Sequence, residues 1–116
     1  MPAPIVETTI PAVLLHLSNP IYTATLTDAV TLTLDNLAQV IKLDPGGANR
    51  NVTLPAPAGW KNSNVLIVNG ADAAENLVIK DSDGNTIATI NQNEEGLFNC
   101  SGTAVTLLRI ATIALS

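Results

Sequence analysis

Charged residues are scarce in this sequence: they make up 13% of its 116 residues, about half the usual share. Five basic residues against ten acidic ones give a net charge of −5, which argues against a nucleic-acid-binding protein. A hydrophobic fraction of 47% argues against a disordered chain. No apolar run approaches the roughly 18 residues of a membrane-spanning helix, so we expect no membrane contact. With so few charges, much of the surface is expected to be covered by other subunits.

Cysteine and histidine each occur once, as Cys100 and His16. A single cysteine excludes an intrachain disulfide and a cysteine zinc site, and a single histidine excludes a multi-histidine metal site within one chain. Cys100 lies in an alternating strand pattern with no base nearby, which indicates a buried, inert thiol. His16 lies in a proline-flanked apolar segment, which indicates a packed or partner-facing residue rather than a catalytic base. We therefore expect no metal, no cofactor and no small-molecule substrate.

Aromatic side chains are equally scarce, because Tyr22, Trp60 and Phe98 are the only ones. Three rings make a carbohydrate-stacking platform a poor explanation of the sequence. Trp60 follows a Pro-Ala-Gly segment in an expected loop. Two interpretations of it stay open: it caps one end of a β core, or it anchors a partner.

Three further segments resemble functional motifs but lack their chemical requirements. In residues 81–85 the glycine is at the fourth position of a calcium loop rather than the sixth, and Gln92 stands where a bidentate Glu is needed. Glu94 and Glu95 are adjacent on a strand and point to opposite faces, so they cannot converge as the carboxylate pair of a hydrolase. The Gly46-Gly47 pair lacks the Lys-Ser/Thr of a phosphate loop. We therefore expect that the protein is not an enzyme.

Short strands at regular spacing dominate the chain from residue 23 onward. Residues 30–34 alternate with period two, and residues 65–69 are a continuous apolar run, which predicts a strand buried on both faces. The Asp-Gly in residues 81–85 predicts a hairpin, and the Pro-Gly-Gly in residues 44–47 predicts a turn. The spacing predicts an all-β fold, a single small antiparallel β-sandwich or barrel. The predicted core is Val30, Leu32, Leu34, Ile41, Leu43, Leu54, Leu66, Val68, Ile79, Ile87, Ile90, Leu97 and Leu107.

Residues 1–22 differ from the β domain of residues 23–116, because they hold four of the seven prolines and are nevertheless apolar. Proline forbids a long helix or a central strand here, so we expect an extended N-terminal arm. No basic residue precedes the apolar stretch, so we expect no secretory signal. Two interpretations stay open: a first edge strand of the same domain, or an intermolecular arm that lies on a neighbouring subunit or on a larger surface. The candidate partner-binding residues are Ile5, Val6, Ile10, Val13, Leu14, Leu15 and Leu17.

Residues 41–56, with the sequence IKLDPGGANRNVTLPA, resemble a small virion protein family of tailed bacteriophages. The resemblance continues through residues 65–69, 71–77 and 83–87, and resumes at residues 92–95 and 100–103. In similar proteins a tryptophan often follows the last Gly-Thr, where this chain has Ala104. The resemblance covers roughly residues 28–108 and leaves the arm uncovered.

The resemblance implies a capsid decoration (cement) or head-fibre protein. Such a protein would bind the major capsid protein on the outer capsid surface of the virion, stabilise the head and form a homotrimer, after synthesis in the host cytoplasm. Three other interpretations stay open. The first is a tail-fibre or spike module that binds a host receptor, the second is a lectin-like cellular β-sandwich, and the third is an undetected enzyme.

Overall fold

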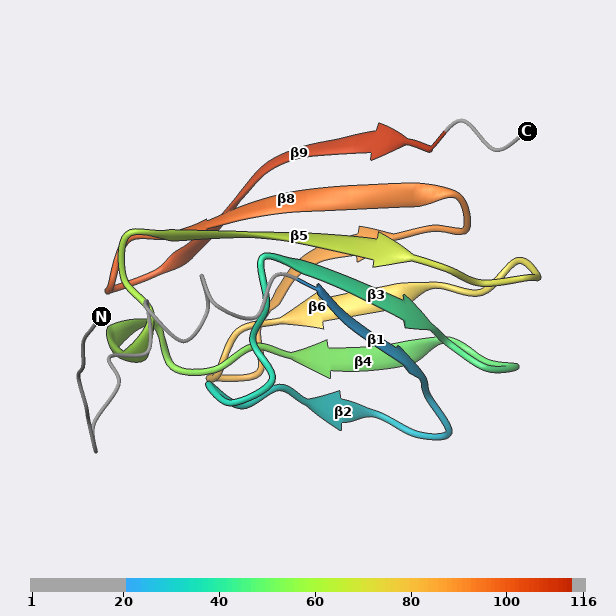
Figure 1. Ribbon diagram of the computed structural model, residues 1–116, viewed down its shortest axis with the longest axis horizontal. Coiled ribbons are helices and arrows are strands. Elements are labelled where there is room, and N and C mark those ends of the chain that lie inside the picture. Colours follow the sequence, from blue (N-terminus) through green and yellow to red (C-terminus); the bar gives the residue numbers. More distant parts are fainter. Residues whose placement is uncertain (1–20, 114–116) are drawn as a thin grey trace, which may run out of the picture.

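The structure is a computed structural model that describes residues 21–113 (Figure 1). These residues form nine strands in two mixed sheets and, as their only helical element, a short 3₁₀ turn, η1 (Pro57–Gly59). The strands are β1 (Ile21–Thr25), β2 (Val30–Thr31), β3 (Val40–Asp44), β4 (Arg50–Thr53), β5 (Ser63–Asn69), β6 (Leu77–Lys80), β7 (Thr86–Ile90), β8 (Glu94–Cys100) and β9 (Val105–Thr112). The all-β class predicted from the sequence is confirmed.

Successive strands alternate between the two sheets along the first half of the chain. Sheet A has the order β1-β3-β5-β8-β9, and sheet B has the order β2-β4-β6-β7. From β1 to β6, odd strands enter sheet A and even strands enter sheet B, so the chain winds as a coil whose turns stack side by side. Strand β7 then forms the edge of sheet B beside β6, and β8 and β9 are added to sheet A beside β5.

The predicted antiparallel pairing was wrong for four of the seven strand pairs. The four pairs within the coil are parallel: β1–β3, β2–β4, β3–β5 and β4–β6. Parallel neighbours need a crossover between them, and here a strand of the opposite sheet supplies it. Regular strand spacing does not distinguish this crossover from a hairpin, so the sequence pattern left the direction undetermined.

One hydrophobic cluster draws side chains from both sheets. Six residues of the predicted core are buried in it: Leu32, Ile41, Leu43, Leu54, Ile79 and Ile90. Four more predicted residues pack against it partly buried: Val30, Leu34, Ile87 and Leu107. Its largest fully buried side chains are Trp60 and Phe98. The cluster therefore forms the interior that holds sheets A and B in place.

Three predicted core residues, Leu66, Val68 and Leu97, are not in this cluster and are partly exposed. In β5 the buried positions alternate with partly exposed ones, so the prediction that residues 65–69 are buried on both faces was wrong. The reason is that, within the described residues, sheet A is covered by sheet B on one face only. The other face of sheet A, here called the outer face, carries these three side chains.

The two predicted turns are confirmed. The residue range 44–47 turns with positive φ at Gly46 and Gly47, and residues 81–85 connect the antiparallel strands β6 and β7. Strand β1 begins at Ile21, so the last two residues of the predicted arm, Ile21 and Tyr22, belong to the β domain. The rest of the arm, with all seven candidate partner-binding residues and His16, lies outside the described residues.

Candidate interaction surface

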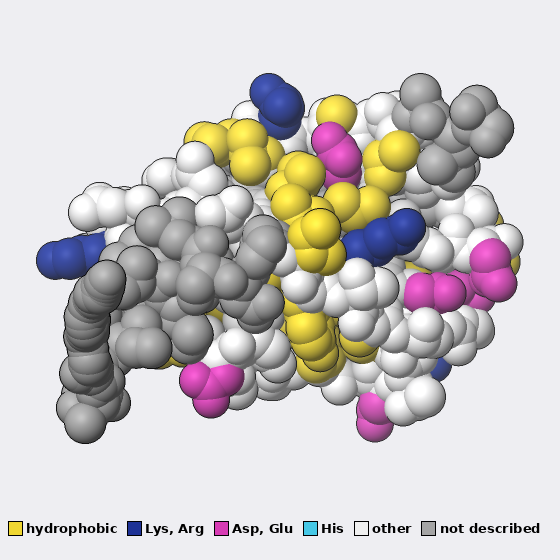
Figure 2. Space-filling view, in the orientation of Figure 1, with side chains coloured by type: hydrophobic (Ala, Val, Ile, Leu, Met, Phe, Trp, Pro, Cys, Tyr) yellow, Lys and Arg dark blue, Asp and Glu magenta, His cyan; other side chains and the backbone are white. Residues whose placement is uncertain are grey.

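A row of apolar side chains crosses the outer face of sheet A. The strand register places one residue of β1, β3, β5 and β8 directly side by side, and partners across a sheet share a face. This apolar row consists of Ile21, Val40, Leu66 and Leu97. Ile21 is 63% exposed and the other three are partly exposed. Figure 2 shows hydrophobic side chains gathered in a band across the visible face of the molecule.

A second row lies one pleat further along the same face. It consists of Thr23, Lys42, Val68, Glu95 and Ala111. Its two charged residues stand on the strands that flank β5, one on β3 and one on β8. Among residues 21–113, neither the Lys42 ammonium nor the Glu95 carboxylate has a hydrogen-bond or ion-pair partner. The outer face therefore presents an apolar centre with Lys42 and Glu95 on either side of β5 and with Arg109 at its β9 edge.

The far edge of this face belongs to β9. The register between β8 and β9 shifts between Leu97 and Phe98, and Leu108 lies at this bulge. Leu108 is 53% exposed, and Arg109 is the partner of Leu97 at the end of the apolar row. Ile21 on one edge strand and Leu108 on the other are thus the exposed large hydrophobic residues of the described chain.

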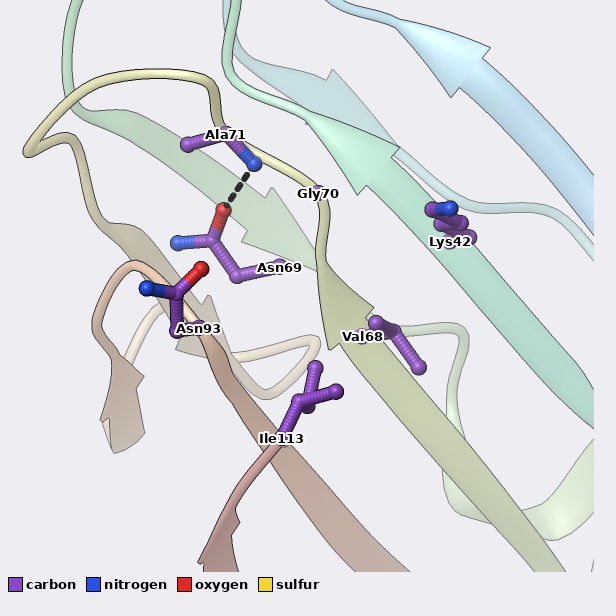
Figure 3. A pocket seen from close by; sticks show the side chains of 7 residues that line it. All are labelled: Lys42, Val68, Asn69, Gly70, Ala71, Asn93 and Ile113. Carbon is purple, nitrogen blue, oxygen red and sulfur yellow. Dashed lines mark hydrogen bonds between the residues drawn. The ribbon is translucent and has the colours of Figure 1, made fainter. Parts of the chain in front are cut away.

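A pocket of about 210 Å³ lies where the outer face meets the ends of β3, β5 and β9 (Figure 3). It is lined by Lys42, Val68, Asn69, Gly70, Ala71, Asn93 and Ile113. A Cβ added to Gly70 would lie 3.2 Å from Cε of Lys42, so the lysine stem lies against this glycine. The Ile113 amide donates to the Asn93 carbonyl at 2.6 Å, which fixes the end of β9 beside the pocket. The pocket is therefore continuous with the second row.

The side chain of Asn69, at the base of the pocket, forms hydrogen bonds with three backbone groups around it. Its amide nitrogen donates to the carbonyl oxygens of Glu75 at 2.8 Å and Ile90 at 2.9 Å, and its Oδ1 accepts from the Ala71 amide at 2.9 Å. The residue is only 2% exposed. A buried amide with its hydrogen bonds satisfied is a structural element rather than a free ligand for chemistry.

Three carboxylates converge next to this loop. Asp44, Asp72 and Glu75 each offer one oxygen, and these oxygens lie within 4.8 Å of one another. Asp44 Oδ1 already accepts from the Gly46 amide at 2.9 Å, whereas Glu75 Oε1 is buried without a hydrogen-bond partner. Carboxylate oxygens are the ligands that Ca²⁺ prefers, so these are the described residues that could hold a divalent cation. This group was not predicted from the sequence, because Asp44 is far from the other two carboxylates along the chain.

The structure also shows the roles of residues that the sequence singled out. Trp60 is 1% exposed and its indole nitrogen donates to the Pro55 carbonyl at 3.1 Å, so it packs in the core. Cys100 is buried, and burial raises the pKa of its thiol, as an inert cysteine requires. Its Sγ donates to the Pro57 carbonyl at 3.3 Å.

The adjacent residues Glu94 and Glu95 have different surroundings and do not form a carboxylate pair, as predicted. Glu94 accepts a hydrogen bond from the Asn91 amide at 2.9 Å and so closes the turn before β8. Glu95 stands on the outer face of sheet A. The apolar row itself was missed in the sequence, because residues 65–68 of β5 are all apolar and the sequence does not show which alternate set is buried.

No protein-family model, curated protein or solved structure matches the chain. Within the described residues no helix is long and apolar enough to cross a membrane.

Proposed function

We propose that this chain is a structural virion protein, a capsid decoration (cement) protein that binds the outer surface of the major capsid protein lattice and stabilises the head. The observation that supports an assembly role is the apolar row on the outer face of sheet A, in a chain with only 13% charged residues. Contiguous exposed apolar surface on a small domain is typical of a protein–protein contact. The resemblance of residues 28–108 to phage head proteins is the reason for proposing the capsid as the partner.

In this proposal the β domain is the rigid part and the arm is the attachment. The two sheets share one core cluster, which favours a single sandwich as the description of the domain. The seven apolar arm residues contact the capsid or a neighbouring subunit: Ile5, Val6, Ile10, Val13, Leu14, Leu15 and Leu17. Burying one such side chain stabilises a contact by roughly 1.5–3 kcal/mol. In a homotrimer three arms act together, so a modest affinity per arm becomes firm retention.

The proposal assigns no catalysis, cofactor or small-molecule substrate to the protein, and neither nucleic acid nor membrane as a partner. Decoration needs only that many weak contacts form between fixed surfaces. The protein would be made in the host cytoplasm and reside on the outer capsid surface of the virion.

The experiment compares retention of the full-length chain and of a chain lacking residues 1–17 on purified capsids. We expect the truncated chain to keep its β circular dichroism and to lose retention, because the domain core lies within residues 21–113. Leu14→Asp with Leu15→Asp should also lose retention, since two carboxylates would be desolvated at the contact. Thr8→Asp with Thr9→Asp is the matched control in the same arm and should retain binding.

Two outcomes would contradict the proposal. Equal retention of full-length and truncated chains would remove the arm from the capsid contact. Recovery of the protein with tails rather than heads in dissociated particles would favour the alternative function, a tail-fibre or spike module that binds a host receptor.

A further inference from the structure

We propose that two copies of the chain pack face to face through the outer faces of their A sheets, about a two-fold axis that runs along β5. The contact goes beyond capsid decoration and does not require a capsid. Two-fold contacts bring the same patch of both copies together, so the patch must be complementary to itself. The outer face of sheet A meets this requirement in the apolar residues along β5 and in the charged residues Lys42 and Glu95.

Rotation about an axis along β5 determines which residues meet. Such a rotation places β5 over β5 of the second copy, β3 over β8, and β1 over β9. It preserves the position of each row, so Leu66 meets Leu66 and Val68 meets Val68 at the centre. In the apolar row Val40 meets Leu97 of the second copy. The contacts of these two rows along the axis are then between apolar side chains, and Asn64, the next outer residue of β5, meets Asn64 of the second copy.

The charges of the second row fit the same axis. Lys42 on β3 of one copy meets Glu95 on β8 of the other, and the symmetry makes this contact twice. Both groups are without a partner within the described part of a single copy. Opposite charges placed in this way fix register and partner orientation across an interface.

The other in-plane axis, along the apolar row, gives a poorer match. It would place the second row over the positions on the other side of the apolar row, so that Val68 would meet Asn64 and Glu95 would meet Asn99. These two asparagines already bond to each other, Asn99 Nδ2 to Asn64 Oδ1 at 2.8 Å. That arrangement leaves the charges unpaired, which costs free energy on burial. The axis along β5 is therefore the one that the side chains favour.

The edges of the face support the same arrangement. Ile21 on β1 and Leu108 on β9 are the exposed large hydrophobic residues of residues 21–113. The axis along β5 brings β1 of one copy over β9 of the other, so that Ile21 lies over Arg109 beside the bulge, where the aliphatic stem of the arginine can cover it. The exposed Ile21 is then covered in both copies.

The dimensions of the face fit a contact of modest strength. Five strands at about 4.8 Å spacing make the face about 24 Å across. Packed sheets keep their strand directions within about 30° of each other, an angle that an axis close to the strand direction produces. A contact of this size falls at the small end of specific interfaces. We therefore expect pairing that depends on concentration.

The first experiment measures the mass in solution across a concentration series for the full chain and for Leu66→Asp. Whatever oligomer the arms form, the unmodified chain should have twice the mass of the variant at high concentration. The aspartate places two carboxylates against each other on the axis. Val78→Asp is the matched control, because Val78 is a partly exposed apolar residue on the outer side of sheet B. This control should pair as the unmodified chain does.

The second experiment uses charge reversal and does not depend on an apolar substitution. Lys42→Glu alone and Glu95→Lys alone should each weaken pairing about tenfold or more, because every opposite-charge contact becomes a like-charge contact. An equimolar mixture of the two variants should pair again, since both contacts in the mixed pair join Glu to Lys. Lys61→Glu and Asp83→Lys change the same charges away from the face and should leave pairing unchanged.

Equal masses for the unmodified chain and Leu66→Asp at every concentration would overturn the proposal. So would a mixture of the charge-reversed variants that fails to pair although each variant is folded by circular dichroism. If Leu66→Asp instead loses capsid retention with no change of mass in solution, the face is a capsid contact and the self-pairing is wrong. Loss of capsid binding on arm truncation tests the proposed function separately.

Discussion

At the residue scale, the one buried side chain of Asn69 forms hydrogen bonds with three separate backbone groups. It joins the end of β5 to the Glu75 carbonyl, the Ile90 carbonyl and the Ala71 amide. We expect Asn69→Leu to lower the free energy of unfolding by about 2–4 kcal/mol, because two buried carbonyls and one amide lose their partner. Urea denaturation monitored by circular dichroism measures this loss.

Asn99 provides the control for Asn69. It also sits on a strand of sheet A and its Nδ2 donates to Asn64 Oδ1, but this bond is exposed. Asn99→Ala should therefore cost less than about 1 kcal/mol, since water replaces the lost partner. Equal losses for the two variants would show that burial of Asn69 adds nothing to the value of its hydrogen bonds.

Asp81 gives the β6–β7 hairpin a dependence on pH. The backbone N–H of Asn85 is the main cause that holds the pKa of Asp81 below its ordinary value of 3.8, and the Asn85 side chain and the amides of Asp83 and Gly84 act in the same direction. The ionised carboxylate therefore stabilises the folded hairpin at pH values above 3.8, and this contribution is lost as the pH falls through the lower, folded-state pKa. We expect Asp81→Asn to flatten the dependence of the urea midpoint on pH below about 4. Asp83→Asn, which removes the same charge from the same turn, should leave it unchanged, and equal effects of both variants would contradict the assignment.

At the element scale, the turn between β3 and β4 depends on one of its two glycines more than on the other. Gly46 has φ 73° and a Cβ there would lie close to the Leu26 carbonyl oxygen, whereas a Cβ on Gly47, with φ 108°, meets nothing within 4 Å. Both substitutions by alanine strain the backbone, but only Gly46→Ala also clashes with the β1–β2 connection. We expect a loss of about 1 kcal/mol for Gly47→Ala and about 3 kcal/mol or more for Gly46→Ala. Thermal or urea unfolding that ranks them in the reverse order would contradict this reading of the turn.

The elements predicted best from the sequence are those determined by local chemistry. The hairpin in residues 81–85 and the turn in residues 44–47 follow from Asp, Pro and Gly at fixed positions, and both are present. Strand direction was not predictable from local sequence. Strand β3 pairs in parallel with β1 and β5, and each of them lies about twenty residues away along the chain. Leu66 and Leu97 were assigned to the core for a related reason. Apolar composition marks a strand as central in its sheet, but only the topology shows that residues 21–113 leave the outer face of sheet A without a covering layer.

The candidate site was even less accessible to sequence reasoning. The apolar row and the Lys42–Val68–Glu95 row combine residues of up to five strands, and only the register brings them together. The arm, in contrast, was identified by composition alone, and its seven apolar residues remain a prediction outside residues 21–113.

At the scale of the whole molecule, the coil concentrates stability in the middle of each sheet. β5 is bonded on both sides, by β3 and β8, and β6 is bonded by β4 and β7, whereas β1 and β2 are edge strands and β2 has only two residues. Amide hydrogens exchange through openings whose free energy rises from frayed edges to the global unfolding of the core. We expect the amides of Val65, Ile67 and Ile79 to exchange slowest, and those of β1 and β2 to exchange fastest. Hydrogen exchange followed by NMR measures the difference in the Leu66→Asp variant, where no pairing through sheet A protects β1. Uniform protection from β1 to β8 would mean that the coil unfolds as one unit and that its edges contribute as much as its centre.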